Sequence, residues 1–208
     1  MRDSLDNLRA FNRKERFFLV GQALGKPSFT LDAQFRGRLD EVFGLQVPEN
    51  AFVAMDYHLD WLYASLFLHE QGTTEGIHPR PDDLITANQE DADLLIAYMD
   101  GNSYHIILLE AKGATGYTNK QMDSKAGRLT KVFGRDGRRW SFATPHFALL
   151  SPRRPSQLNT DEWPGWMKAD GKPAWLPLPM PADLVRVTRC DENGKAAQDG
   201  KYWRVVRG

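Results

Sequence analysis

The chain has 208 residues with 27 basic and 27 acidic side chains, and 41% of its residues are hydrophobic. This composition favours one globular domain over a disordered chain, and the lone Cys190 excludes an internal disulfide framework or a cysteine-based zinc site. No apolar run approaches the roughly 18 residues of a membrane span and the N-terminus lacks a signal peptide, so we expect a cytoplasmic protein without membrane association.

The first half of the chain predicts three helical segments and one short strand. Apolar residues recur at helical spacing in these segments, and glycines follow them as natural ends. The helical segments are residues 4–24, 31–43 and 56–70, and the short strand is residues 84–87.

The second half predicts further strands, one helix and a C-terminal hairpin. Residues 93–112 contain two apolar, strand-like runs, residues 118–133 a helix, and residues 146–150 a strand. A Trp/Pro-rich irregular stretch of residues 152–181 leads to alternating runs at 184–189 and 202–207, which are typical of a hairpin.

The order of these elements is helix, strand, strand, strand, helix, strand. It predicts a mixed α/β (α+β) fold in which helices flank a small mixed sheet. We expect a single domain with an N-terminal helical part (1–55), a core (56–150) and the Trp/Pro-rich segment with the hairpin (151–208).

A charged triplet, Glu110-Ala111-Lys112, closes the second of the two central apolar runs. Other acid-x-Lys triplets begin at Asp123, Asp170 and Asp199, but none of them ends so apolar a run. Strand residues two apart point to the same face, so Glu110 and Lys112 share a direction. Both charges are expected to be partly desolvated, and they must therefore be paired or bound to something charged.

Asp60 is a second candidate, because it falls on the apolar side of the helix over residues 56–70. A carboxylate there needs a metal ion, an arginine or backbone amides. A site residue and a structural ion pair are both consistent with this position.

The helix over residues 118–133 carries Gln121, Lys125 and Arg128 along one flank. This flank is either solvated or faces an anionic substrate beside Lys112. Residues 112–154 carry ten basic and two acidic residues, whereas residues 1–111 carry nine basic and eighteen acidic ones. The basic block indicates either a phosphate-binding surface or charge pairing across the fold.

Several other kinds of site are excluded or less favoured. The chain has no H-E-x-x-H pattern, phosphate-binding G-x-x-x-x-G-K loop or serine nucleophile motif, and His105 and His146 are expected to belong to strands. Three tryptophans near basic residues would either stack on bases or, as we favour, pack a loop over the core. These residues are Trp163, Trp166 and Trp175, with Arg153, Arg154 and Lys168 nearby.

Asp93 at the head of one strand, Glu-x-Lys at the end of the next, and a following helix with Gln and Lys resemble the PD-(D/E)XK nuclease superfamily. The resemblance covers approximately residues 56–150 and implies a restriction-endonuclease-like core of helix, three strands, helix and strand. Ala92 stands where many members have Pro, and Lys125 stands where some branches have Tyr.

The resemblance implies a role for each matched residue. Asp93 and Glu110, with the Ala111 carbonyl, would bind Mg²⁺ or Mn²⁺, and Asp60 would stand where many members have a helical Glu. Lys112 would orient the attacking water, with Gln121 beside it. Lys125, Arg128 and Lys131 would contact nucleic acid.

The function expected from this resemblance is metal-dependent hydrolysis of phosphodiester bonds in DNA, with endonuclease activity and a homodimer as further expectations. The alternative is a catalytically silent protein of the same fold that binds nucleic acid or a protein partner. Divalent ions held by carboxylates generate hydroxide and stabilise phosphate charge, which the acid-acid-Lys set would support.

Overall fold

Two long antiparallel strands, β2 (Asp91–Asp100) and β3 (Ser103–Ala111), form the centre of the fold. The computed structural model describes residues 3–25, 29–79, 84–87, 90–113, 115–181 and 183–207. Gly101 has φ 56° in the turn between the two strands, a left-handed conformation that glycine adopts without a side-chain clash. The predicted pair of central strands is therefore confirmed.

The main sheet has the strand order β1-β2-β3-β4-β7 within the described residues. The outer strands are β1 (Phe52–His58), β4 (Ala143–Ser151) and β7 (Trp175–Pro177). β1 and β3 are both antiparallel to β2, whereas β4 runs parallel to β3 and β7 runs parallel to β4. The sheet is thus mixed, as predicted.

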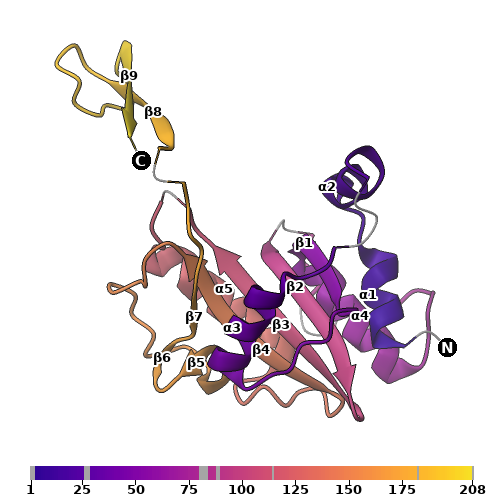
Figure 1. The fold of residues 1–208 in the computed structure, drawn as a ribbon. Helices are drawn as coiled ribbons and strands as arrows, with labels where there is room; N and C mark the ends of the chain where they lie inside the picture. The colour runs from indigo at the N-terminus through magenta and orange to yellow at the C-terminus, as the bar shows by residue number, and fades with distance from the viewer. Residues whose placement is uncertain are drawn as a thin grey trace.

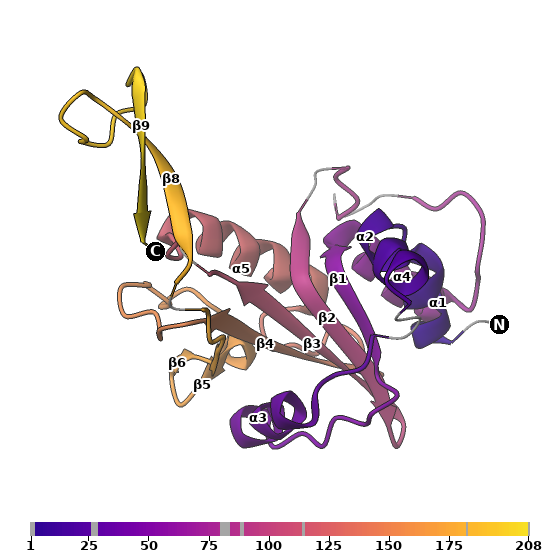
Figure 2. The ribbon, with the colours of Figure 1, turned by 45° about the horizontal axis from the view of Figure 1, so that its top comes forward.

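Helices cover both faces of this sheet (Figures 1 and 2). α4 (Leu59–Gln71) and α5 (Asn119–Phe133) lie on one face, with α1 (Ser4–Phe11) packed on α4, and α3 (Ala33–Phe43) lies on the other. β3 residues alternate accordingly, because Ile106 and Leu108 are in the α4/α5 core whereas Ile107 and Leu109 are in the α3 core. The predicted flanking helices are confirmed.

Side chains and glycines define the ends of these helices. The hydroxyl of Thr118 accepts a hydrogen bond from the Gln121 amide at the start of α5, as an N-cap residue does. α3 and α4 end at Gly44 and Gly72, each with φ 66°. The predicted helices over residues 31–43 and 118–133 are confirmed to within two residues. The first predicted helical segment consists of α1, α2 (Glu15–Phe18) and a short π-helix, Leu19–Ala23.

One predicted helix starts later than expected, and one predicted strand is wrong. The helix expected over residues 56–70 is confirmed as α4, but it begins only at Leu59 because the preceding residues form β1. This strand also replaces the end of the helical part expected over 1–55. Asp56 interrupts the strand with φ 49° just before the chain turns into α4. Residues 84–87 form no strand, because the Thr86 and Ala87 amides donate to the Asp60 carboxylate instead of to a neighbouring strand.

The C-terminal third packs a Trp/Pro-rich segment against the sheet and then leaves the body of the molecule. Trp163 is 1% exposed and contacts Phe147 edge-on, and Trp166 contacts Phe133, so the loop-packing interpretation is confirmed for these two side chains. Short elements in this segment are a 3-10 helix, Gly165–Met167, and the β5–β6 pair, Lys168–Ala169 with Lys172–Pro173.

The predicted C-terminal hairpin is confirmed as β8 (Val185–Cys190) and β9 (Tyr202–Arg207), which pair with each other and project from the body (Figures 1 and 2). Across the described ranges, no helix is both long enough and apolar enough to cross a bilayer.

Candidate functional site

The pairing of β2 with β3 brings Asp93 and Glu110 side by side at one end of the sheet. Leu94 lies opposite Leu109 in the ladder, so the next residues outward are Asp93 on β2 and Glu110 on β3. Asp93 Oδ2 accepts a hydrogen bond from the Ala111 amide at 2.6 Å. The two acids predicted as metal ligands are thus neighbours on adjacent strands.

Glu110 is 2% exposed, and its carboxylate contacts three of the side chains that the sequence predicted as site residues. Lys112 Nζ lies 3.1 Å and Gln121 Nε2 lies 3.2 Å from Oε1, and Lys125 Nζ lies 2.8 Å from Oε2. The shared face of Glu110 and Lys112 is therefore confirmed. We call Asp93, Glu110, Lys112, Gln121 and Lys125 the acid–lysine cluster.

Burial raises the pKa of the Asp93 carboxyl, and the nearby Glu110 charge raises it further. The Ala111 amide, Lys112 and Lys125 lower the same pKa and oppose these effects. Two carboxylates held this close concentrate negative charge, and cations relieve the repulsion between them. The cluster is thus an acidic pair balanced by two lysines.

The donor set fits a magnesium-type ion. Mg²⁺ commonly binds through one or two carboxylates and keeps several waters. Asp93 and Glu110 would supply the carboxylates, and the Ala111 carbonyl a third oxygen. Among the described residues there is no group of three or more His, Cys, Asp or Glu side chains placed to hold a metal. The side-chain ligands of any such ion would therefore be this pair of acids, with the Ala111 carbonyl and water as its other ligands.

Asp60 contacts a different set of residues. Its Oδ1 lies 2.5 Å from Arg128 NH2, and its Oδ2 accepts hydrogen bonds from the Thr86 and Ala87 amides at 3.0 and 2.8 Å. Both side chains of the pair are about nine-tenths buried. Asp60 thus forms a structural ion pair, which was the alternative interpretation of this residue. Within the described ranges, no hydrogen bond or ion pair joins Asp60 to Glu110.

The basic residues of α5 divide into buried and exposed ones. Lys125 and Arg128 are buried and hold Glu110 and Asp60, whereas Lys131 is exposed. Charge pairing across the fold thus accounts for part of the basic block. A direct contact of Lys125 or Arg128 with nucleic acid would require these ion pairs to open. Of the three basic residues, only the exposed Lys131 could contact nucleic acid without such a rearrangement.

Tyr117 is a residue near the cluster that the sequence did not indicate. Its hydroxyl lies 2.9 Å from the carbonyls of Glu110 and Leu150 and accepts a hydrogen bond from the Leu150 amide at 3.0 Å. Burial raises the pKa of Tyr117 to about 12, so the hydroxyl keeps its proton. Tyr117 thus holds the ends of β3 and β4 together directly behind Glu110.

Asp91 connects the cluster to the N-terminal segment. Its Oδ2 lies 2.6 Å from Lys14 Nζ, and its backbone carbonyl accepts a hydrogen bond from Lys125. A single residue at the start of β2 therefore contacts both a lysine before α2 and a lysine of the cluster.

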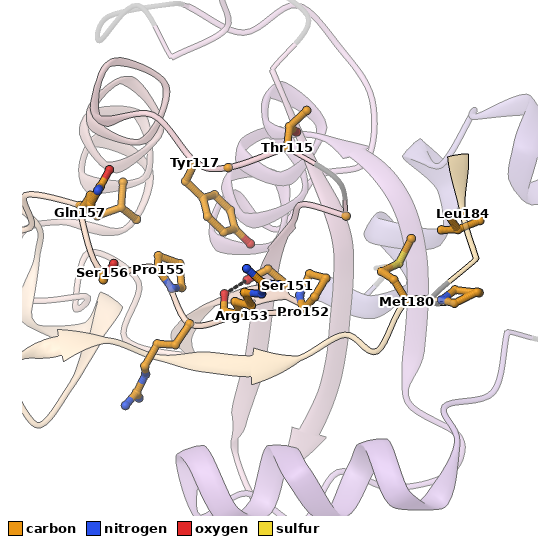
Figure 3. Close-up of a pocket in the computed structure, with 15 residues that line it drawn as sticks. Thr115, Tyr117, Ser151, Pro152, Arg153, Pro155, Ser156, Gln157, Met180 and Leu184 are labelled. Carbon is orange, nitrogen blue, oxygen red and sulfur yellow. Dashed lines mark hydrogen bonds between the residues drawn. The ribbon is translucent and has the colours of Figure 1, made fainter. Parts of the chain in front are cut away.

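A cavity of about 660 Å³ lies next to the cluster, at the ends of β3 and β4 (Figure 3). Gly113, which follows Lys112, and Tyr117 line it, but the side chains of the acid–lysine cluster do not. Arg153 and Arg154, which follow β4, also line it. The cavity and the cluster are thus neighbours that share the loop between β3 and α5.

Comparisons with known proteins give no match to this chain among protein-family models, curated proteins or solved structures. Its function is therefore inferred from the geometry of the cluster and of the cavity beside it.

Proposed function

We propose that the protein is a metal-dependent nuclease that hydrolyses phosphodiester bonds in DNA at the acid–lysine cluster. The observation that carries this proposal is the convergence of Asp93, Glu110, Lys112 and Gln121, from two strands and a helix, at one end of the sheet. The resemblance to the PD-(D/E)XK superfamily rests on these same residues.

The roles within the cluster follow from its contacts. Asp93 and Glu110 would hold the metal ion, which supplies an activated water and neutralises phosphate charge when it is bound. The Lys112 side chain is 20% exposed, so its ammonium would reach a phosphate while still paired with Glu110. Gln121, exposed and bound to Glu110 Oε1, would orient the water or a phosphate oxygen.

The order of elements around the cluster supports the proposal in part. α4, β2, β3, α5 and β4 follow one another as helix, two strands, helix and strand, whereas the restriction-endonuclease-like core has three strands after its first helix. The remaining strand, β1, precedes α4 instead of following it, and pairs with β2 at the edge of the sheet.

The decisive experiment is a cleavage assay with plasmid and with single-stranded DNA in Mg²⁺ or Mn²⁺. We expect Lys112→Ala and Asp93→Asn to reduce cleavage at least about 100-fold, because each removes charge stabilisation that acts on the reacting phosphate. Lys120→Ala, which removes an exposed lysine of α5 outside the cluster, is the matched control. Cleavage that survives both cluster substitutions would refute the assignment of the site.

A second function is favoured by a specific observation. Both carboxylate oxygens of Glu110 already contact side-chain donors, which suits a charge-balanced structural site as well as a metal site. A catalytically silent nucleic-acid-binding protein would bind DNA in the same assay without cleaving it in any metal. A homodimer stays a prediction, and sedimentation of the purified protein would test it.

A further inference from the structure

The cavity beside the acid–lysine cluster has a position and a lining that suit a defined ligand. Three segments enclose it: the loop between β3 and α5, the residues after β4, and the stretch before β8. In Figure 3, Tyr117 points toward Ser151 and Arg153, while Met180 and Leu184 stand on the opposite side. Its volume of about 660 Å³ is in the range of small-molecule and cofactor pockets.

Part of the cavity lining is apolar. It consists of the Tyr117 ring, Pro155, Leu158, Met180 and Leu184, with Met180 and Leu184 across from Tyr117. An aromatic ring among aliphatic side chains offers a surface for a nucleobase or a sugar, since every base has a face that can stack. Such a lining would give affinity with little preference for one base.

Arg153 adds a cation to this lining. It is exposed, and no hydrogen bond or ion pair of its guanidinium occurs within the described part of the chain. Its neighbour Arg154 lies over the Trp175 ring, 5.8 Å from the centroid, and so has a packing role. A guanidinium binds phosphate through paired hydrogen bonds, and Thr115, Ser156 and Gln157 add further polar groups around the cavity.

We propose that this cavity binds a nucleoside phosphate, with the base against the apolar side chains of the lining and the phosphate on Arg153. Building on the proposed nuclease function, the nucleotide would be the one next to the bond that is cleaved, because Gly113 in the cavity wall directly follows Lys112. The same chemistry is present in a DNA strand and in a free mononucleotide.

The test is a binding measurement in EDTA, where no cleavage occurs. The probe is a fluorescein-labelled single-stranded oligonucleotide followed by anisotropy, with deoxyadenosine monophosphate as competitor. Arg153→Ala removes the cation, and Ser156→Trp fills the cavity without changing charge. We expect each to weaken oligonucleotide binding about tenfold, the loss of one well-placed phosphate contact or one stacked base.

Two matched controls lie at the other end of β4. Arg138→Ala removes an exposed arginine and Ser141→Trp adds a tryptophan at an exposed position, both in the connection from α5 to β4. We expect both controls to bind within twofold of the unaltered protein. Thermal unfolding of each variant verifies that it is folded, and Arg153→Ala decides the outcome if Ser156→Trp does not fold.

The outcomes separate this inference from the proposed function. Cavity variants that bind like their controls overturn the inference, whether or not the protein cleaves DNA. Weakened binding in both cavity variants, in a protein that cleaves nothing, supports the inference and refutes the nuclease. Displacement of the oligonucleotide by the mononucleotide supports a single-nucleotide site, whereas an oligonucleotide that needs Arg153 and is not displaced identifies the DNA strand as the ligand.

Discussion

Glu110 is a buried carboxylate whose charge is balanced by cations from two different elements. Lys112 contacts it from the position just after β3 and Lys125 contacts it from α5. The Glu110 and Lys125 side chains are 3% and 8% exposed. A buried pair contributes little compared with apolar replacements, but breaking it by removal of one partner is costly. The stability of the fold therefore depends on which member of the cluster is altered.

Lys125→Met tests this at the buried pair. We expect it to lower the free energy of unfolding by about 3 kcal/mol, because Glu110 would keep a buried charge with one cation fewer. Urea unfolding followed by tryptophan fluorescence measures the loss, and Lys120→Met is the exposed control on the same helix. Equal free energies of unfolding for the two variants would show that breaking the Glu110–Lys125 pair does not destabilise the fold.

Tyr117→Phe tests the hydroxyl that joins the ends of β3 and β4. It removes the acceptor of the buried Leu150 amide, which we expect to cost about 1–3 kcal/mol, the usual penalty for an unsatisfied buried polar group. The same denaturant titration gives the value. Faster amide hydrogen exchange at Leu150 is expected as well, and unchanged protection there would contradict this role.

Among the elements, β3 and β4 are joined by a pair of histidines on the face that α3 covers. His105 Nδ1 lies 3.0 Å from His146 Nε2, the rings stack, and Tyr98 stacks on His105. Such a hydrogen bond needs one nitrogen without a proton, so protonation of both rings disrupts it. Burial lowers the pKa of His146 to about 4, and the neighbouring His105 adds to this shift.

The pH dependence of stability follows from this pair. His146 has a lower pKa in the folded state than its ordinary value of 6.5, so its contribution is complete above pH 6.5 and is lost as the pH falls toward 4. We expect a loss on the order of 2–3 kcal/mol across this range. Denaturant unfolding at several pH values measures it, and His146→Phe should flatten the profile between pH 6.5 and 4.

The sequence predicted contacts within elements better than contacts between distant ones. Glu110 and Lys112 point to the same side because side chains two residues apart in a strand do so. Gln121 and Lys125 lie on the same side of α5 because residues four apart are neighbours on a helix surface. The ion pair of Asp60 with Arg128 joins residues 68 positions apart, which no local pattern indicates. β1 was missed because its apolar run is short and ends at the left-handed Asp56.

For the same reason, parts of the candidate site lay beyond sequence reasoning. Helical spacing put Lys125 on the flank of an amphipathic helix, but only the packing of α5 on β2 and β3 buries it. The cavity forms where three separate segments of the chain meet, so the sequence placed Arg153 in a basic block and near the tryptophans but did not predict the cavity that it lines.

For the whole molecule, the β8–β9 hairpin is an appendage to the packed body (Figure 2). Val187 and Trp203 are 70% and 69% exposed, and an isolated two-stranded hairpin is marginally stable in water. Its side chains add little to the core, whereas the stretch before it closes the cavity through Met180 and Leu184.

A protein that ends after Leu184 tests whether the β8–β9 hairpin contributes to the stability of the body. We expect its melting temperature to lie within about 2 °C of that of the full chain, because a contribution of 1 kcal/mol shifts a domain of this size by about 2–4 °C. Differential scanning calorimetry compares the two proteins. A fall of more than about 5 °C would show that the hairpin stabilises the body substantially.

Asp91 links the N-terminal segment to the acid–lysine cluster, although the two are far apart in the sequence. Its carboxylate contacts Lys14 and its carbonyl contacts Lys125, which in turn contacts Glu110. A partner that displaced the N-terminal segment would disturb Asp91, and with it the position of Lys125. Thermodynamic linkage makes such an effect reciprocal, so a ligand that reorders the cluster would also change how tightly the first helices are held.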